Sequence, residues 1–247
     1  MCGRYANSKS GGDMAALFDA EDLITGAWEP RFNIAPTASA PVVRRSKSRG
    51  KAQPSDESGA AGGRVVDLAR WGLVPPWASD PSIGTRMFNA RIETVATSKA
   101  YRRPFASRRA LIPADGWYEW RKLPGGGKQP YFFTRPGGVV FAGLWESWKQ
   151  GEASMLSFTV LTCPAMGEAF EAVHDRMPYV LPPERFAAWL GEEDAGEDEL
   201  LAGPNPGLPK EIELRKVGRA VGRTGNEGPE LVRAVDGDEG PSTLPGM

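Results

Sequence analysis

The chain has little cysteine and little histidine. Its 247 residues include two cysteines, Cys2 and Cys163, and one histidine, His174. Two cysteines provide no disulfide framework, and one histidine with two cysteines cannot form a zinc site of four Cys/His ligands. Carboxylate sites for magnesium or manganese stay open on this count alone. We expect no metal site and no cofactor.

Long apolar runs are missing as well. None approaches the roughly 20 residues that span a bilayer, and the opening residues MCGRYANSKSGGD lack the apolar stretch of a signal peptide. The low cysteine count fits a reducing compartment. With 40% hydrophobic residues, the chain is long enough for one sizeable core. We therefore expect a globular, monomeric, cytoplasmic protein with no membrane partner.

The chain has no global excess of positive charge. Its net charge is −1 and its isoelectric point is about 6.0, which taken alone argues against a nucleic-acid partner. The distribution is uneven, because 84–110 carries seven basic residues against the single acid Glu93, whereas 191–200 carries six acids and no base. This asymmetry indicates either a basic face that binds nucleic acid or a solvated surface without a partner.

Turn signals and apolar runs predict an α+β fold with mostly antiparallel strands. Hairpin turns are expected at 124–127 and 136–138, which favours a sheet that closes as a barrel or packs as a sandwich. Strands are expected over 65–71, 110–114, 117–122, 131–134, 139–144 and 156–162. Short flanking helices are expected over 13–24 with Asp13 as N-cap, and over 96–101, 165–173 and 183–190.

The sequence indicates one domain over 1–235. Within it, the stretch from Arg45 to Arg64 turns to Ser, Lys, Gly, Ala and Pro, which is typical of a disordered insertion between strands. Residues 236–247 are rich in Gly, Pro and acids, and we expect a disordered tail. No internal repeat or βαβ pattern is visible.

Cys2 follows Met1, so one processing cut would leave cysteine first, with a thiol and a free α-amine on one carbon. An aldehyde accepts both nucleophiles, first as an imine and then as a five-membered thiazolidine. Ordinary pKa values of about 7.7–8.0 for the amine and about 8.5 for the thiol leave a useful fraction of each nucleophilic near neutrality. A cysteine at this position can equally be an incidental feature of a frayed terminus.

Glu119 is a carboxylate among aromatic residues, in the run Trp117-Tyr118-Glu119-Trp120. Partial desolvation on a strand would raise its pKa toward the range useful for proton transfer. Strand alternation offers the other interpretation, in which Glu119 points outward to water.

His174 is the only side chain whose ordinary pKa lies between 5 and 8, and it precedes Asp175 and Arg176. It is a candidate acid/base or a structural group at a helix end. Asn89 and Arg91 share a face if their segment is extended, which would offer an amide for an amine and a guanidinium for a phosphate. The other interpretation is a turn asparagine beside a surface arginine.

Six short motifs together are more specific than any one of them. They are Met1–Tyr5 (MCGRY), Arg31–Pro36 (RFNIAP), Trp71–Pro75 (WGLVP), Asn89–Thr94 (NARIET), Gly116–Trp120 (GWYEW) and His174–Pro178 (HDRMP). In this order they resemble the SRAP family of SOS response-associated peptidases, now interpreted as abasic-site-processing proteins. The resemblance runs from Cys2 to about Leu231.

The resemblance implies a DNA-damage protein that binds abasic sites in single-stranded DNA and links Cys2 covalently to the sugar aldehyde. By the same resemblance, Asn89 positions the α-amine, Glu119 assists proton transfer at the sugar, and His174 helps to form and reverse the imine. Residues that match phosphate-holding positions are Arg4, Arg91 and Arg176, with Thr162 as a further candidate. Pro36 and Trp77 match an apolar wedge that unstacks bases, although Ala78 stands where some relatives carry a second aromatic residue.

Three functions remain open on the sequence. The first is a shield that crosslinks abasic DNA reversibly, with weak lyase activity because an imine at an abasic site can undergo β-elimination. The second is an N-terminal-nucleophile peptidase or hydrolase, in which the thiolate attacks an acyl carbon and which removes its own Met1. The third is a non-catalytic DNA-binding module in which Cys2 is incidental.

Overall fold

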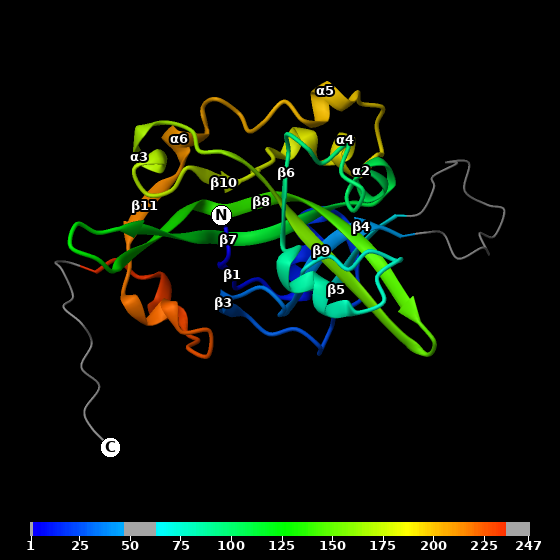
Figure 1. The fold of residues 1–247 in the computed structure, drawn as a ribbon, viewed down its shortest axis with the longest axis horizontal. Helices are drawn as coiled ribbons and strands as arrows, with labels where there is room; N and C mark the ends of the chain where they lie inside the picture. The colour runs from blue at the N-terminus through cyan, green and yellow to red at the C-terminus, as the bar shows by residue number, and fades with distance from the viewer. Residues whose placement is uncertain (1, 47–62, 236–247) are drawn as a thin grey trace, which may run out of the picture.

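A single mixed sheet organises the computed structural model, which describes residues 2–46 and 63–235 (Figure 1). The strands are β1 (Tyr5–Asn7), β2 (Ala20–Asp22), β3 (Arg31–Ile34), β4 (Ser39–Arg45), β5 (Arg64–Trp71), β6 (Asn89–Arg91), β7 (Arg109–Lys122), β8 (Lys128–Gln150), β9 (Ala153–Pro164), β10 (Arg176–Pro178) and β11 (Glu213–Lys216). The helices are α1 (Gly11–Phe18), α2 (Arg102–Ser107), α3 (Glu168–Glu171), α4 (Phe186–Leu190), α5 (Glu197–Leu200) and α6 (Leu208–Glu211).

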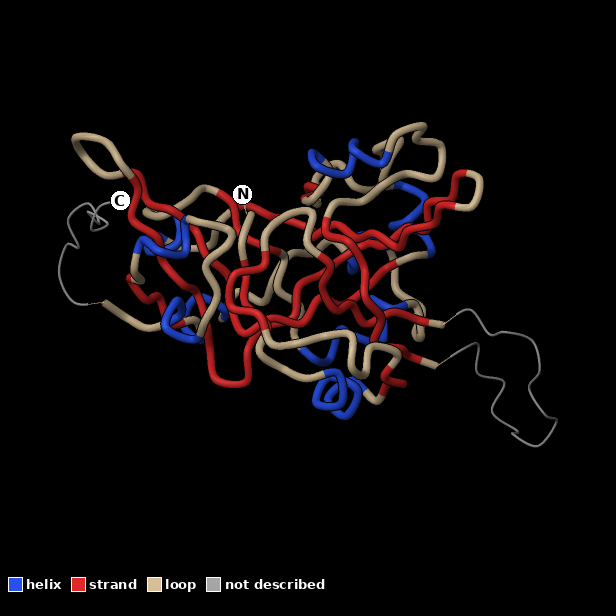
Figure 2. The backbone as a smooth tube through the Cα atoms, turned by 90° about the horizontal axis from the view of Figure 1, so that it is seen from below, coloured by secondary structure: helices blue, strands red, loops and turns tan. Residues whose placement is uncertain are grey.

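Five strands close on themselves. Pairing runs from β8 through β9, β5, β4 and β7, and β7 pairs again with β8, so this part of the sheet forms a barrel. Most pairs are antiparallel, but β2–β5, β5–β9 and β6–β9 are parallel. The predicted α+β fold is confirmed. Seen from below, the short helices lie around the periphery of the strands (Figure 2).

The long strands β7 and β8 merge segments that the sequence separates. The predicted turn at 124–127 is confirmed, because Leu123 and Gly127 close the hairpin between Lys122 and Lys128. The predicted turn at 136–138 is wrong. There, residues 135–138 bulge out of β8 opposite Asp115, and the positive φ angles of Gly137 and Gly138 allow the chain to continue in the same strand.

Helix lengths differ from the predictions. Helix α1 starts at Gly11 because Ser10, not Asp13, is its N-cap; Asp13 completes the capping box at the third helical position. The helix ends at Phe18, well before the predicted residue 24. Of the other predicted helices, 96–101 forms turns before α2, and 165–173 shrinks to α3. The stretch 183–190 begins with a 3₁₀ turn and ends, as expected, before a left-handed Gly191.

The predicted insertion from Arg45 to Arg64 is too wide. Arg45 ends β4, Arg64 begins β5, and the two pair directly. The rest of that stretch, 47–62, lies outside the described residues, as does the predicted tail at 236–247. In the described parts of the chain, no helix combines the length and apolar character needed to cross a membrane.

Aromatic packing fixes the amino-terminal strand against the barrel. The Tyr5 ring contacts Trp71 and Phe141 edge-on, at centroid distances of 5.1 and 6.0 Å. Trp117 stacks on Phe133 at 4.8 Å. All five side chains are buried. Because rings of this size contribute much apolar area and specific geometry, they hold β1 and β7 in register beside the start of the chain.

Candidate active site

Strand pairing brings Cys2 next to the second half of β7. Tyr5 of β1 pairs with Trp117, and the Tyr118 amide donates to the Arg4 carbonyl at 2.9 Å. The segment that precedes β1 therefore continues along β7 toward Glu119. The aromatic packing described above makes this approach rigid.

Asn89 holds the Cys2 backbone from the opposite side. Its Nδ2 donates to the Cys2 carbonyl at 2.7 Å. Asn89 begins β6, which runs parallel to β9, and the Tyr101 hydroxyl donates to its carbonyl at 3.2 Å. The segment is a strand, so the condition under which Asn89 and Arg91 share a face is met. The amide of Asn89 thus anchors the residue from which an N-terminal amine would project.

Glu119 is buried, with 3% of its surface exposed. Burial raises the pKa of this carboxyl to about 7, and the positive charge of the amino terminus opposes the shift. Of the two interpretations that the sequence left open, the structure supports desolvation. Trp117 and Tyr118 are buried too. The side chains on both faces of this part of β7 are therefore shielded from solvent, and the alternation of the strand does not bring Glu119 to the surface. A carboxyl with this pKa exchanges protons readily at neutral pH.

The Cys2 thiol is completely buried, and its pKa is raised well above the ordinary value. Burial is the main cause, and the negative charge of Glu119 adds to it. The expectation that a useful fraction of the thiol is ionised near neutrality is therefore wrong for the folded protein. The thiol stays protonated until a group accepts its proton, and Glu119 lies close enough to influence it.

His174 lies in the loop between α3 and β10. Burial, followed by the charge of the amino terminus, lowers the pKa of His174, while Asp175 opposes the shift. The neutral imidazole is thus favoured near pH 7. Its Nδ1 accepts from the Arg176 amide at 3.0 Å and lies 2.8 Å from Asp175 Oδ1. Nδ1 cannot accept a hydrogen bond from the Arg176 amide and donate one to the Asp175 carboxylate at the same time. Which of the two bonds forms depends on whether Nδ1 carries the ring proton.

Arg176, Thr162 and Arg91 lie on three neighbouring strands. In the register of β9, Thr162 pairs with Arg91 of β6 on one side and with Pro178 of β10 on the other. Arg176 Nη2 donates to the Thr162 carbonyl at 2.6 Å and to its Oγ1 at 3.2 Å. The same guanidinium forms an ion pair with Glu93, a residue whose role the sequence did not reveal.

Arg4, Pro36 and Trp77 lie in other surroundings. Arg4 is buried, donates from Nη1 to Asn33 Oδ1 and to the Val221 carbonyl, and lies over the Trp120 ring. Pro36 is half-buried, two residues after β3 ends. Trp77 is 54% exposed, and Lys99 Nζ lies 5.2 Å from its ring centroid. Asn33 lies in the motif Arg31–Pro36 and Lys99 in the basic range 84–110, but the sequence does not show that Asn33 accepts from Arg4 or that Lys99 lies against Trp77.

The basic range 84–110 divides into two groups. Arg108 pairs with the buried Glu146, and Arg109 donates to the carbonyls of Trp189 and Phe105, so both act inside the fold. The exposed basic residues of the range are Arg86, Arg91, Lys99, Arg102 and Arg103. The basic face is therefore smaller than the sequence count indicates.

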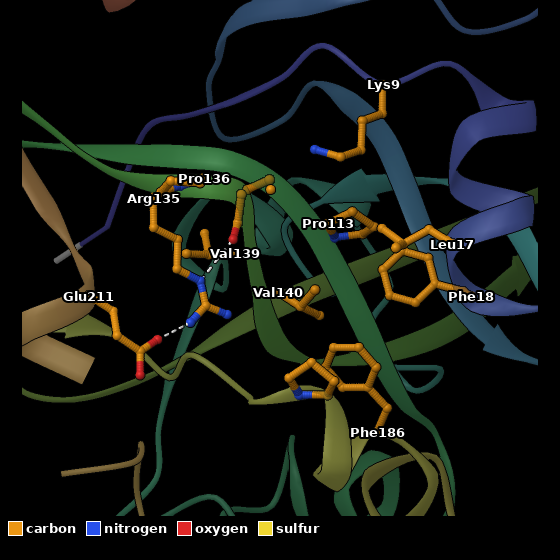
Figure 3. Close-up of a pocket in the computed structure, with 14 residues that line it drawn as sticks. Lys9, Leu17, Phe18, Pro113, Arg135, Pro136, Val139, Val140, Phe186 and Glu211 are labelled. Atoms are coloured by element: carbon orange, nitrogen blue, oxygen red, sulfur yellow. Dashed lines mark hydrogen bonds and ion pairs between the residues drawn. The ribbon is translucent and has the colours of Figure 1, made fainter. Parts of the chain in front are cut away.

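A large apolar cavity lies away from these residues. It has a volume of about 430 Å³ and is bounded by Leu17 and Phe18 of α1, Phe186 of α4 and the bulged part of β8 (Figure 3). None of the ten predicted site residues lines it. A shallower hollow of about 320 Å³ includes Trp77. Among the described residues there is no cluster of three or more His, Cys, Asp or Glu side chains able to hold a metal ion.

A closed mixed sheet, with a buried cysteine and a buried carboxylic acid beside its first strand, defines the class of this protein as a small α+β domain. The family model described as SOS response associated peptidase (SRAP) matches residues 1–224. The chain belongs to the SRAP family, which confirms the resemblance of its motifs.

Relatives from bacteria match almost the whole chain. It is 31% identical over 237 residues to abasic site processing protein YoqW of Bacillus subtilis (strain 168), covering 95% of this chain and 100% of that protein. Abasic site processing protein YedK of Escherichia coli (strain K12) is 32% identical over 244 residues, with the same coverage. A crystal structure of a protein from Bacteroides thetaiotaomicron shares the fold, with a TM-score of 0.78 at 18% identity and coverage of 95% and 100%.

Replacing Glu119 with glutamine is expected to change how stability depends on pH. Because the folded pKa of about 7 exceeds the ordinary 4.5, the folded protein binds the extra proton between these values. Wild-type stability then falls as pH rises from about 5 to about 7, by roughly 3 kcal/mol at most. Urea unfolding at pH 5 and pH 8 measures this. The stability of Glu119→Gln relative to wild type should increase between the two; a constant difference would contradict the shifted pKa.

Proposed function

We propose that this protein recognises abasic sites in single-stranded DNA and, once Met1 is removed, shields them by joining Cys2 covalently to the sugar. The observation that carries the proposal is the burial of Cys2 close enough to Glu119 for the carboxylate to raise the pKa of the thiol, together with the pKa of about 7 of Glu119 itself. The names of the relatives, abasic site processing proteins, support the same substrate.

The chemistry needs both nucleophiles of Cys2. The α-amine adds to the aldehyde carbon of the ring-opened deoxyribose, and loss of one water gives the imine. The sulfur then adds to the same carbon, and the thiol proton ends on the ring nitrogen, which closes a thiazolidine. The product is protein plus DNA minus one water, and no oxidant or cofactor is consumed.

Burial of the thiol favours the order in which the amine reacts first. A protonated, inaccessible thiol is a poor nucleophile for a free aldehyde, but it becomes competent once the imine carbon is bonded next to it. Glu119 accepts the thiol proton and returns one to the nitrogen. His174, neutral near pH 7, accepts a proton from the nitrogen as the amine adds to the aldehyde, and the resulting imidazolium gives that proton to the departing hydroxyl. Asn89 keeps the Cys2 backbone in place.

DNA contacts follow from the polar residues around this centre. Arg91, Arg176 and Thr162 lie on β6, β9 and β10, where guanidinium groups fit phosphates. Arg4 serves a phosphate from a more buried position. Trp77, exposed on its loop, and Pro36 act as the wedge against which bases unstack.

The peptidase alternative has less support from the site. Attack on an acyl carbon requires a thiolate, and the burial that raises the pKa of Cys2 disfavours this form. Removal of Met1 by the protein itself is an attack on an acyl carbon too, and it would need Glu119 to take the thiol proton first. Slow β-elimination through the imine needs no thiolate and is compatible with the same centre.

The proposal is tested with purified protein and a single-stranded oligonucleotide that carries one abasic site. We expect a band on a denaturing gel whose mass equals protein without Met1 plus DNA minus one water. The same oligonucleotide with an intact base should give no such band. Non-covalent binding without any adduct would contradict the proposal and support the alternative of a non-catalytic DNA-binding module.

A further inference from the structure

The Arg176 guanidinium is already occupied by a carboxylate. Its Nη1 forms an ion pair with Glu93 Oε1, and its Nη2 donates to Oε2 at 3.0 Å, so the two groups meet as a bidentate fork. The Arg176 side chain is 13% exposed, whereas that of Glu93 is 44% exposed. The arginine is therefore fixed by Thr162 from within the protein, and the carboxylate covers it from the solvent side.

The surroundings of Glu93 favour an anion. Its hydrogen bonds from Arg176 lower the pKa of the carboxyl, and the charge of Arg91 lowers it further, against the effect of partial burial. Glu93 is also the single acid among the seven basic residues of 84–110. A carboxylate and a phosphate present two oxygens to a guanidinium in the same planar arrangement. The position of Glu93 is thus one that a backbone phosphate also fits.

We propose that Glu93 occupies the place of a DNA phosphate in the free protein, and that a phosphate of the bound strand displaces it from Arg176. The inference rests on the proposed function, because it specifies how the same site admits single-stranded DNA. No bond is made or broken. One hydrogen-bonded anion replaces another, and the Glu93 carboxylate moves into water.

The exchange is energetically modest. A partly exposed ion pair contributes little to stability, so one phosphate among several along a strand can replace it. An isolated anion gains little over the tethered carboxylate, whereas a strand that also reaches Arg91 gains several contacts together. Glu93 therefore makes the site selective for polyanions over single anions.

The opposite role for Glu93 predicts the opposite sign. If the carboxylate only orients Arg176 toward a phosphate that binds elsewhere on the guanidinium, removing its charge releases the arginine and weakens DNA binding. The sign of the change in affinity therefore separates competition from support.

The test measures binding of an undamaged, fluorescently labelled single-stranded oligonucleotide by anisotropy at low salt. Glu93→Gln should bind about fivefold more tightly than wild type, the equivalent of about 1 kcal/mol. The matched control is Glu213→Gln, which removes one charge from another bidentate pair, with Arg215 on β11. Its affinity should stay close to that of wild type.

A double-mutant cycle locates the effect. In the Arg176→Ala background, the increase in DNA affinity caused by Glu93→Gln should become much smaller, because the guanidinium for which carboxylate and phosphate compete is absent. An equal gain in both backgrounds would reduce the effect to general repulsion and overturn the proposal, as would weaker binding by Glu93→Gln in a protein whose unfolding curve matches wild type. Adduct formation on abasic DNA is scored separately, so loss of the proposed function is distinguishable from failure of the exchange.

Discussion

Replacing Cys2 with alanine is expected to abolish the stable adduct with abasic single-stranded DNA. The variant keeps an α-amine, so it still forms the imine, but no sulfur is present to close the ring. Imines hydrolyse when the protein is denatured, whereas the thiazolidine survives. We expect the adduct band to fall by about two orders of magnitude or more, because intramolecular closure has an effective molarity of about 10⁵ M or higher that no dissolved thiol replaces.

Two measurements make this result specific. Borohydride added during the reaction should reduce the imine of Cys2→Ala and restore a covalent band, which places the defect at ring closure. Cys163→Ala is the matched control, since it removes the other cysteine, which is buried on β9 with its Sγ facing the Met177 carbonyl. That variant should crosslink like wild type. An undiminished band from Cys2→Ala without reductant would rule out the thiazolidine.

Local sequence signals predicted those strands and turns that depend only on residues close together in the chain. The runs now in β5 and β9 and the hairpin at 124–127 carry their own alternation and turn residues. The glycine-rich stretch at 136–138 shows the same kind of signal and forms a bulge instead. Its outcome depends on the register of β8 against β7, which is set by side chains on both strands and cannot be seen in one segment.

The candidate site was visible as chemistry but not as geometry. Cys2 and Glu119 stand out by position and by aromatic neighbours, yet the burial that keeps the thiol protonated comes from the packed barrel. The contact from Asn89 to the Cys2 carbonyl joins residues 87 apart in sequence. The bidentate ion pair between Arg176 and Glu93 joins residues 83 apart in sequence, although each residue belongs to one of the six motifs. Such contacts depend on strand order, which no local pattern encodes.

Replacing Glu119 with glutamine is expected to slow crosslink formation and reversal by about a hundredfold, within the range typical of general acid–base catalysis. Glutamine keeps the size and hydrogen-bonding capacity of the side chain but cannot carry a proton from sulfur to nitrogen. Glu119→Asp retains a carboxyl at a shorter reach and should recover part of the rate. Equal rates for Glu119→Gln and wild type in both directions would remove Glu119 from the mechanism.

The pH profile separates this role from simple loss of structure. Both proteins should react faster as the α-amine deprotonates, with its ordinary pKa of about 7.7–8.0. Only wild type gains in addition from ionisation of Glu119, whose pKa is about 7. The ratio of wild-type to Glu119→Gln rates, measured under single-turnover conditions from pH 5.5 to 8.5, should therefore rise through about pH 7 and then level off. A structural defect would lower the rate by one factor at every pH, because a misplaced side chain does not titrate.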